Sequence, residues 1–149
     1  GHGHKEEIVS KPTVISFLQG ISIKSISCTD GNTVCVDENG SVLVFGSNSY
    51  GSLGIGLDPE SFSFASTPQT ISNLPPIKSV CCGYFFTIFL SENGCLYSVG
   101  DNYYGQLGIG NNEYCNSPQK IDTLNNVTLV SCGSKHVVCM TSNDDIYTW

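Results

Sequence analysis

The sequence contains no arginine: its six basic residues are all lysines, and they face thirteen acidic residues for a formal net charge of −7. Arginine is the side chain that grips phosphate and guanine with paired hydrogen bonds, so that mode of recognition is absent. A negative field also repels nucleic acid and anionic lipid surfaces. We therefore expect no direct nucleic-acid contact from this chain and no membrane partner.

Long apolar runs are absent too. No stretch approaches the roughly 18 apolar residues of a membrane-spanning helix, and no signal peptide is visible at the start. Charged residues make up only 13% of the chain, whereas hydrophobic residues make up 40%. This balance favours a packed, strand-rich protein over a disordered one.

One stretch of the sequence occurs twice, at residues 46–56 and 100–110, with eight of eleven positions identical. We name these stretches the first and second glycine loops. Their shared residues include Gly46, Asn48, Tyr50, Gly51, Leu53, Gly54 and Gly56 in the first loop, and Gly100, Asn102, Tyr104, Gly105, Leu107, Gly108 and Gly110 in the second. Self-similarity at a period near 50 residues is typical of propellers and solenoids.

The segments before the glycine loops recur as well. Three apolar strands are expected in each unit, at 24–28, 78–82 and 128–132, then 34–36, 88–90 and 138–140, then 42–45, 95–99 and 146–149. Asn39-Gly40 and Asn93-Gly94 predict hairpins with positive φ at both central residues. Proline-led segments at 12–15, 68–71 and 118–121 predict a fourth strand that precedes the other three. Near-continuous apolar runs indicate sheets covered on both faces.

These patterns divide the chain into units that begin at the prolines. We expect one unit at 12–67, a second at 68–117 and an incomplete third at 118–149. Residues 1–11 are interpreted as the tail of a preceding unit, since Gly1-His-Gly3 matches Gly54-Ile-Gly56. The first unit is longer because of an insertion at 57–66, and such insertions often project from a rim and carry binding.

The eight cysteines also follow the repeat. Cys28, Cys82 and Cys132 share one position, and no Cys-x-x-Cys pair suggests zinc. Cysteines that recur inside apolar strands behave as small buried hydrophobes, and reduced thiols fit the cytoplasm or nucleus. Cys132, His136 and Cys139 lack a fourth ligand. We therefore expect reduced core thiols, a cytoplasmic or nuclear location, and no metal.

The glycine loops invite comparison with a phosphate-binding loop. Such a loop opens a helix, however, and here strands and a proline follow. The alternative is structural: glycines such as Gly105 adopt positive φ, Leu53 and Leu107 anchor the loops to the core, and Asn48 and Asn102 bond turn amides. No nucleophile, base and orienting group can be assembled, so we expect no catalytic residues and no cofactor.

Aromatic residues are the candidates for recognition. Five aromatics stand in expected loops or turns: Phe62, Phe64, Tyr84, Phe85 and Tyr103. Aromatic side chains contribute much of the binding energy at protein interfaces, although they also pack between the sheets of a propeller. We expect these residues to contact a partner protein.

The pattern Gly-x-Asn-x-Tyr-Gly-x-Leu-Gly-x-Gly, with a downstream proline and a Cys-Gly turn, resembles the repeat of the regulator of chromosome condensation family. A histidine often follows that turn in the family; Gly133 and His136 comply, whereas Phe86 and Asn32 replace it, so His136 is interpreted as structural. The resemblance implies an all-β, seven-bladed β-propeller, of which this chain is a part.

Three functions follow from the resemblance. The first is a protein-interaction or scaffold segment of a larger regulatory protein. The alternatives are part of a guanine-nucleotide exchange factor for a small GTPase, and the repeat region of a ubiquitin ligase. Fold alone does not choose among them.

Overall fold

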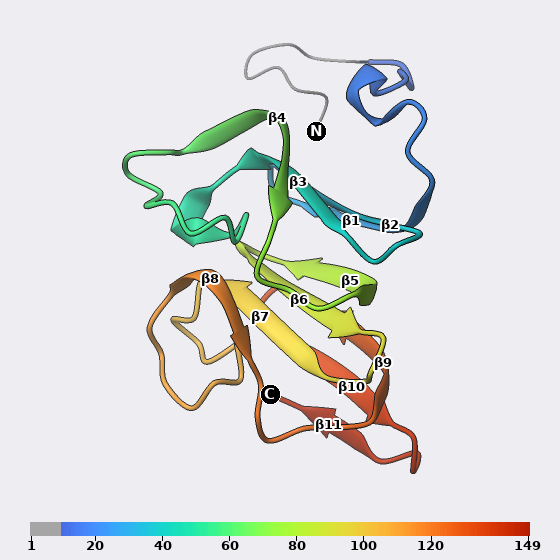
Figure 1. Ribbon diagram of the computed structural model, residues 1–149. Helices are drawn as coiled ribbons and strands as arrows, with labels where there is room; N and C mark the ends of the chain where they lie inside the picture. Colours follow the sequence, from blue (N-terminus) through green and yellow to red (C-terminus); the bar gives the residue numbers. More distant parts are fainter. Residues whose placement is uncertain (1–9) are drawn as a thin grey trace.

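A computed structural model describes residues 10–149 as three antiparallel sheets arranged side by side (Figure 1). Blade 1 contains β1 (Ile23–Thr29), β2 (Asn32–Asp37), β3 (Val42–Ser47) and β4 (Phe64–Ile71). Blade 2 contains β5 (Ile77–Gly83), β6 (Phe86–Ser91), β7 (Leu96–Gly100) and β8 (Cys115–Lys120). Blade 3 contains β9 (Val127–Cys132), β10 (Val137–Thr141) and β11 (Ile146–Thr148). The remaining elements are two short 3-10 helices, η1 (Ser16–Leu18) and η2 (Ser49–Gly51), and the all-β prediction is confirmed.

The Asn-Gly hairpins are confirmed, but their predicted turn type is wrong. In the turn between β2 and β3, Gly40 has φ of 83° while Asn39 stays outside the positive-φ region. Gly40 N donates to Asp37 O at 2.9 Å, and Asp37 N donates to Ser41 O at 3.0 Å. This is a type I turn followed by a left-handed residue, which closes a hairpin with only one residue at positive φ.

The proline-led strands belong to different sheets from those expected. The strand that contains Pro68, β4, pairs with β3 of the hairpin before it, and β8 with Pro118 pairs with β7. The proline strand is therefore the last strand of its sheet and not the first. The segment from Pro12 to Ile15 is not a strand. The reason is geometric: β4 and β8 are edge strands, and an edge tolerates a proline that cannot donate to the ladder.

Two hydrophobic cores fill the space between the blades, and blade 2 contributes to both. All six residues of β6 are buried. Phe89 faces the core shared with blade 1, whereas Ile88 and Leu90 face the core shared with blade 3. Alternation of side chains across a strand explains this division. The prediction that sheets are covered on both faces is therefore confirmed for the middle blade.

The same repeat position shows what a neighbouring blade does. Val80 on β5 is 7% exposed because it packs against blade 1, whereas Ile26, its counterpart on β1, is 72% exposed. The two positions carry similar β-branched side chains. Their burial differs because of their neighbours rather than their residue type.

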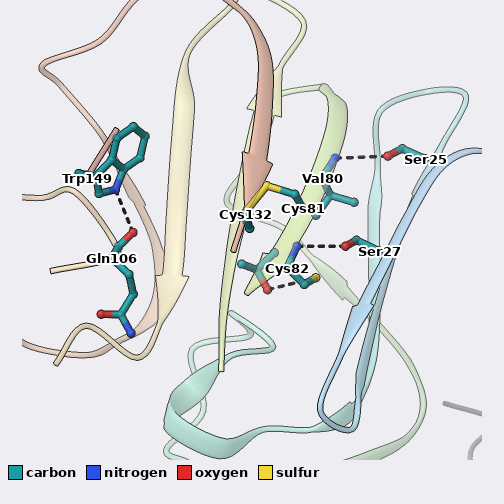
Figure 2. The surroundings of a disulfide bond; sticks show 9 residues. Ser25, Ser27, Val80, Cys81, Cys82, Gln106, Cys132 and Trp149 are labelled. Carbon is teal, nitrogen blue, oxygen red and sulfur yellow. Dashed lines mark hydrogen bonds between the residues drawn. A yellow bond between two sulfur atoms is a disulfide. The ribbon is translucent and has the colours of Figure 1, made fainter. Parts of the chain in front are cut away.

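The innermost strands β1, β5 and β9 meet at two junctions, which we name junction 1 (blades 1 and 2) and junction 2 (blades 2 and 3). At junction 1, Val80 N donates to Ser25 Oγ at 3.3 Å and Cys82 N donates to Ser27 Oγ at 3.0 Å. At junction 2, a disulfide joins Cys81 to Cys132 (Figure 2).

The expectation that all core cysteines are reduced is therefore wrong for Cys132. Successive residues of a strand point to opposite faces, so the Cys81-Cys82 doublet presents a thiol to each neighbouring blade. Cys82 lies beside β1, and Cys81 reaches β9 (Figure 2). Cys35 and Cys139 are buried free thiols, as expected, whereas Cys28 is exposed. The predicted cytoplasmic or nuclear location stays a prediction.

Within the described residues, no helix is long and apolar enough to cross a membrane. The proposed match between Gly1-His-Gly3 and the glycine loops lies outside the described residues.

Candidate partner-binding surface

The two glycine loops follow β3 and β7 and lie on the same side of the sheets (Figure 1). Each is held by a buried asparagine. Asn48 Nδ2 donates to Phe62 O at 2.8 Å, and its Oδ1 accepts from Leu53 N at 3.2 Å. Asn102 does the same with Asn111 O at 2.8 Å and Leu107 N at 2.9 Å. The predicted role of the two asparagines is confirmed.

The loops are also anchored by their leucines. Leu53 and Leu107 are fully buried and belong to the two inter-blade cores. No helix follows either loop; β4 and β8 come next. A phosphate-binding loop would need the backbone N–H groups of a helix N-terminus at this point. The loops are therefore rigid supports for the side chains that they carry.

The side chains that they carry outward are aromatic. We name the following set the aromatic rim: Tyr50, Tyr84, Phe85, Tyr103, Tyr104 and Tyr114. Tyr50 and Phe85 have ring centroids 5.3 Å apart, Tyr84 and Phe85 4.1 Å, and Tyr103 and Tyr104 4.9 Å. Tyr103 is 73% exposed, and the other four tyrosines are also exposed. The turn Tyr84-Phe85 comes from β5 and β6, so the rim joins loops that are distant in sequence.

Three of the five predicted aromatics lie in this rim, namely Tyr84, Phe85 and Tyr103. Phe62 and Phe64 do not. Phe62 packs partly buried against the core of blades 1 and 2, and Phe64 begins strand β4 with its side chain half-buried. The insertion therefore contacts the first glycine loop through the Phe62 carbonyl, which accepts from Asn48, and its two phenylalanine side chains do not project into solvent. Their predicted role in partner binding stays a prediction.

Three rim residues are not among the predicted binding residues. Tyr50 and Tyr104 belong to the recurring structural motif, and Tyr114 lies outside it. A usable signal existed: glycine, asparagine and leucine in the motif each have a structural task, whereas a bulky tyrosine at a recurring loop position has none. Tyr50 also has φ of 55°, which is uncommon for a residue with a side chain.

The repeat places a side chain of the next blade against each loop tyrosine. Phe85 contacts Tyr50, and at the equivalent position of blade 3 the ammonium of Lys135 lies 4.1 Å from the centroid of Tyr104. The hydrogen bond with Tyr104 raises the pKa of Lys135, and the charges of Tyr104 and Asp101 act in the same direction. A cation over a tyrosine face is attracted by the ring quadrupole.

The histidine position of the family pattern has a packing role. The His136 ring lies over Gly133, where any Cβ would collide with it. The Phe86 ring lies over Gly83 in the same way. The turn therefore needs a ring above a glycine, which both residues supply. Among residues 10–149, no three His, Cys, Asp or Glu side chains form a group that could hold a metal ion.

Antiparallel sheets of four, four and three strands meet along their innermost strands, and this arrangement defines a β-propeller as the class of fold. The sequence pattern of the family "Regulator of chromosome condensation (RCC1) repeat" matches residues 39–90 and 93–140, and a second pattern of the same repeat matches residues 23–52 and 77–106. The chain belongs to the regulator of chromosome condensation repeat family.

Two relatives illustrate the range of proteins that carry this repeat. The chain is 34% identical over its whole length to the secretion-regulating guanine nucleotide exchange factor of Bos taurus, of which it covers 32%. It is 30% identical to the E3 ubiquitin-protein ligase HERC2 of Homo sapiens, of which it covers 3%. The chain thus spans about a third of the exchange factor's length.

Solved structures agree on the fold. Yeast RCC1 (Prp20), solved bound to Kap60, superposes with a TM-score of 0.77 at 24% identity, over 85% of this chain and 32% of that one. Human WBSCR16 superposes with a TM-score of 0.75 at 23% identity, over 85% of this chain and 33% of that one.

Proposed function

We propose that this chain supplies a protein-binding face to an RCC1-type propeller, and that the aromatic rim is that face. The observation that carries the proposal is the exposure of tyrosines held by rigid loops of adjacent blades. Exposed, preorganised aromatics bind partners at low entropic cost, because few rotamers have to be frozen. Single exposed apolar residues are ordinary on protein surfaces, but a group of five exposed tyrosines around the half-buried Phe85 is not.

The partners of relatives support a protein ligand. The crystal structure of yeast RCC1 (Prp20) contains bound Kap60. Prp20p of Saccharomyces cerevisiae also has binding properties toward Gsp1p and histones. These statements concern those proteins, and they favour a protein partner here.

The test compares the partners of the intact protein with those of a rim variant. We expect Tyr84→Ala combined with Tyr103→Ala to lose at least one specific partner in quantitative affinity capture, by about tenfold or more. Tyr147→Ala is the matched control, since Tyr147 is an exposed tyrosine on β11 outside the rim. A rim variant that retains every partner, with the fold intact by circular dichroism, would exclude the rim as the binding face.

A second candidate is nucleotide exchange on a small GTPase. The observation that favours it is the 34% identity with an exchange factor over the whole chain. Nucleotide exchange needs a surface that deforms the nucleotide site of the GTPase, and it needs no nucleophile or general base. The fold alone does not show whether this chain has that activity. We expect the intact protein to accelerate release of a fluorescent guanine nucleotide from one member of a GTPase panel. If the rate of nucleotide release is unchanged for every GTPase of the panel, the exchange function is rejected and the scaffold function remains.

A further inference from the structure

Two adjoining hollows open on the aromatic rim. The larger, of about 420 Å³, is lined by Tyr50 and Tyr114 together with Asp58 and Glu60. The smaller, of about 310 Å³, shares Tyr50 and Tyr114 and adds Asp101, Tyr103 and Glu113. The two tyrosines therefore stand between the hollows as a common wall. Neighbouring side chains on a partner segment could enter both.

The lining is acidic as well as aromatic. Each hollow has two carboxylates, Asp58 with Glu60 and Asp101 with Glu113, and neither is lined by a lysine. The two salt bridges found in residues 10–149 join Lys24 to Glu92 and Lys120 to Asp122, so none of the four carboxylates takes part in one. Asp58, Glu60 and Glu113 are therefore available to an external cation, whereas Asp101 already interacts with the charge of Lys135.

The fold already contains one cation held in this manner. Lys135 lies over Tyr104, beside Asp101, at junction 2. At junction 1 the corresponding turn residue is Phe85, which contacts Tyr50 with an uncharged ring. Ser47 takes the place of Asp101 at junction 1, but the hollow beside Tyr50 is lined by Asp58 and Glu60 of the insertion and by no lysine. Phe85 packs against Tyr50 in place of a cation, so the hollow lined by Tyr50, Tyr114, Asp58 and Glu60 contains no basic side chain of the described residues.

We propose that the hollow lined by Tyr50, Tyr114, Asp58 and Glu60 binds a lysine or arginine side chain from a basic segment of a partner protein. The cation stacks on the tyrosine rings, Asp58 and Glu60 neutralise it, and a second basic side chain enters the hollow beside Asp101 and Glu113. The chemistry combines cation–π attraction with opposite charge at an exposed site. This inference rests on the proposed function, because it takes the rim to be the partner-binding face.

Charge excludes the other kinds of occupant. A chain with a net charge of −7 and four carboxylates at the hollows repels acidic peptides and nucleic acid. An apolar peptide would leave the carboxylates desolvated and unpaired, which is costly. A basic segment is the class of ligand that satisfies both features of the surface.

The probe is a short fluorescein-labelled peptide of alternating arginine and serine, and the control peptide has citrulline in place of arginine. We expect the arginine peptide to bind the intact protein in fluorescence anisotropy, and the citrulline peptide to bind at least about fivefold more weakly. A lysine peptide reports whether the ammonium suffices. Affinity falls as salt is raised, because exposed charges are screened.

The decisive variant is Asp58→Asn with Glu60→Gln. Asp58 Oδ1 accepts from Glu60 N at 2.8 Å, and asparagine retains that oxygen, so the loop is preserved. Asp144→Asn with Asp145→Asn is the matched control, since it removes the same charge from the exposed turn between β10 and β11. We expect the rim variant to weaken binding about fivefold and the control variant less than about twofold.

Equal weakening by the two variants would overturn the proposal, because binding would then reflect net charge alone. Tyr50→Phe should retain binding and Tyr50→Leu should lose it, since only the aromatic face attracts a cation. The outcomes also separate this inference from the proposed function. If Tyr84→Ala with Tyr103→Ala abolishes capture of a partner while the arginine peptide does not bind, the rim is the binding face and the basic ligand is wrong.

Discussion

Junctions 1 and 2 join equivalent strands by different chemistry. Position 27 of blade 1 is a serine whose Oγ accepts from Cys82 N, and the equivalent residue of blade 2 is Cys81, bonded to Cys132. One junction is held by hydrogen bonds and the other by a covalent bond, although the backbones meet alike. The comparison shows that repeat geometry fixes which positions meet, and that a single residue then decides how strongly.

The largest expected effect is conversion of junction 2 into the serine type by Cys81→Ser. The disulfide closes a sequence separation of 51 residues, for which loss of the crosslink costs about 4 kcal/mol of unfolding free energy in the chain-entropy view. A serine hydrogen bond to Cys132 N would offset about 1 kcal/mol. We expect a net loss of about 3 kcal/mol, seen as a lower melting temperature of the intact protein.

Two controls accompany this measurement. Cys115→Ser removes a free, half-buried thiol and should leave the melting temperature nearly unchanged. Added reductant should lower the melting temperature of the wild type and not that of Cys81→Ser. A wild type that melts identically with and without reductant would contradict the crosslink's role.

The glycine loops differ between the junctions in a second way. Gly51 and Gly105 both have positive φ, at 71° and 78°. A Cβ at Gly51 would lie 2.7 Å from Cα of Asn116, whereas a Cβ at Gly105 meets nothing within 4 Å. We expect Gly105→Ala to cost about 1 kcal/mol for the left-handed backbone, and Gly51→Ala about 2 to 3 kcal/mol because a backbone clash is added. Chemical denaturation of both variants tests this, and equal losses would count against the clash.

The reciprocal change makes junction 1 resemble junction 2. Ser27→Cys places a thiol where the Ser27 side chain now contacts Cys82, in the register that Cys81 and Cys132 occupy. We expect a second inter-blade disulfide and a gain of about 2 kcal/mol, detected as the loss of one free thiol in mass spectrometry after alkylation. Ser25→Cys is the control, since no cysteine stands at position 80. If the thiols at position 27 and at Cys82 both remain reactive in oxidised Ser27→Cys, the two junctions do not share the same register.

The smallest effect concerns pH. Burial raises the pKa of the Cys82 thiol above its usual 9.0, although hydrogen bonds with Ser27 and Thr87 oppose this. The unfolded chain therefore ionises first as pH rises past 9, so the stability that this thiol contributes is present below that pH and is lost above it. Cys132, the counterpart at junction 2, does not titrate because it is bonded. We expect Cys82→Ala to reduce the alkaline loss of stability, measured by denaturation at pH 8 and pH 10.

The glycine loops and the aromatic rim also contain contacts of two kinds, those within one blade and those between blades. The repeat alone was sufficient to identify Asn48 and Asn102 as loop supports, since their hydrogen bonds depend on neighbours in sequence. It was not sufficient to find Tyr114 or the pairing of Lys135 with Tyr104. Those contacts join residues from different blades, and no periodicity within one blade encodes them.

Local patterns were enough to predict the hairpin strands, the glycine loops, the family and the all-β fold, because alternation, turn residues and repetition act over short distances along the chain. Three features become visible only in three dimensions: the proline strand closes the preceding sheet, Cys81 is bonded to Cys132, and six aromatics share one rim. Each of these depends on which strand lies beside which. Strand pairing and blade stacking are long-range contacts, and local propensity does not specify them.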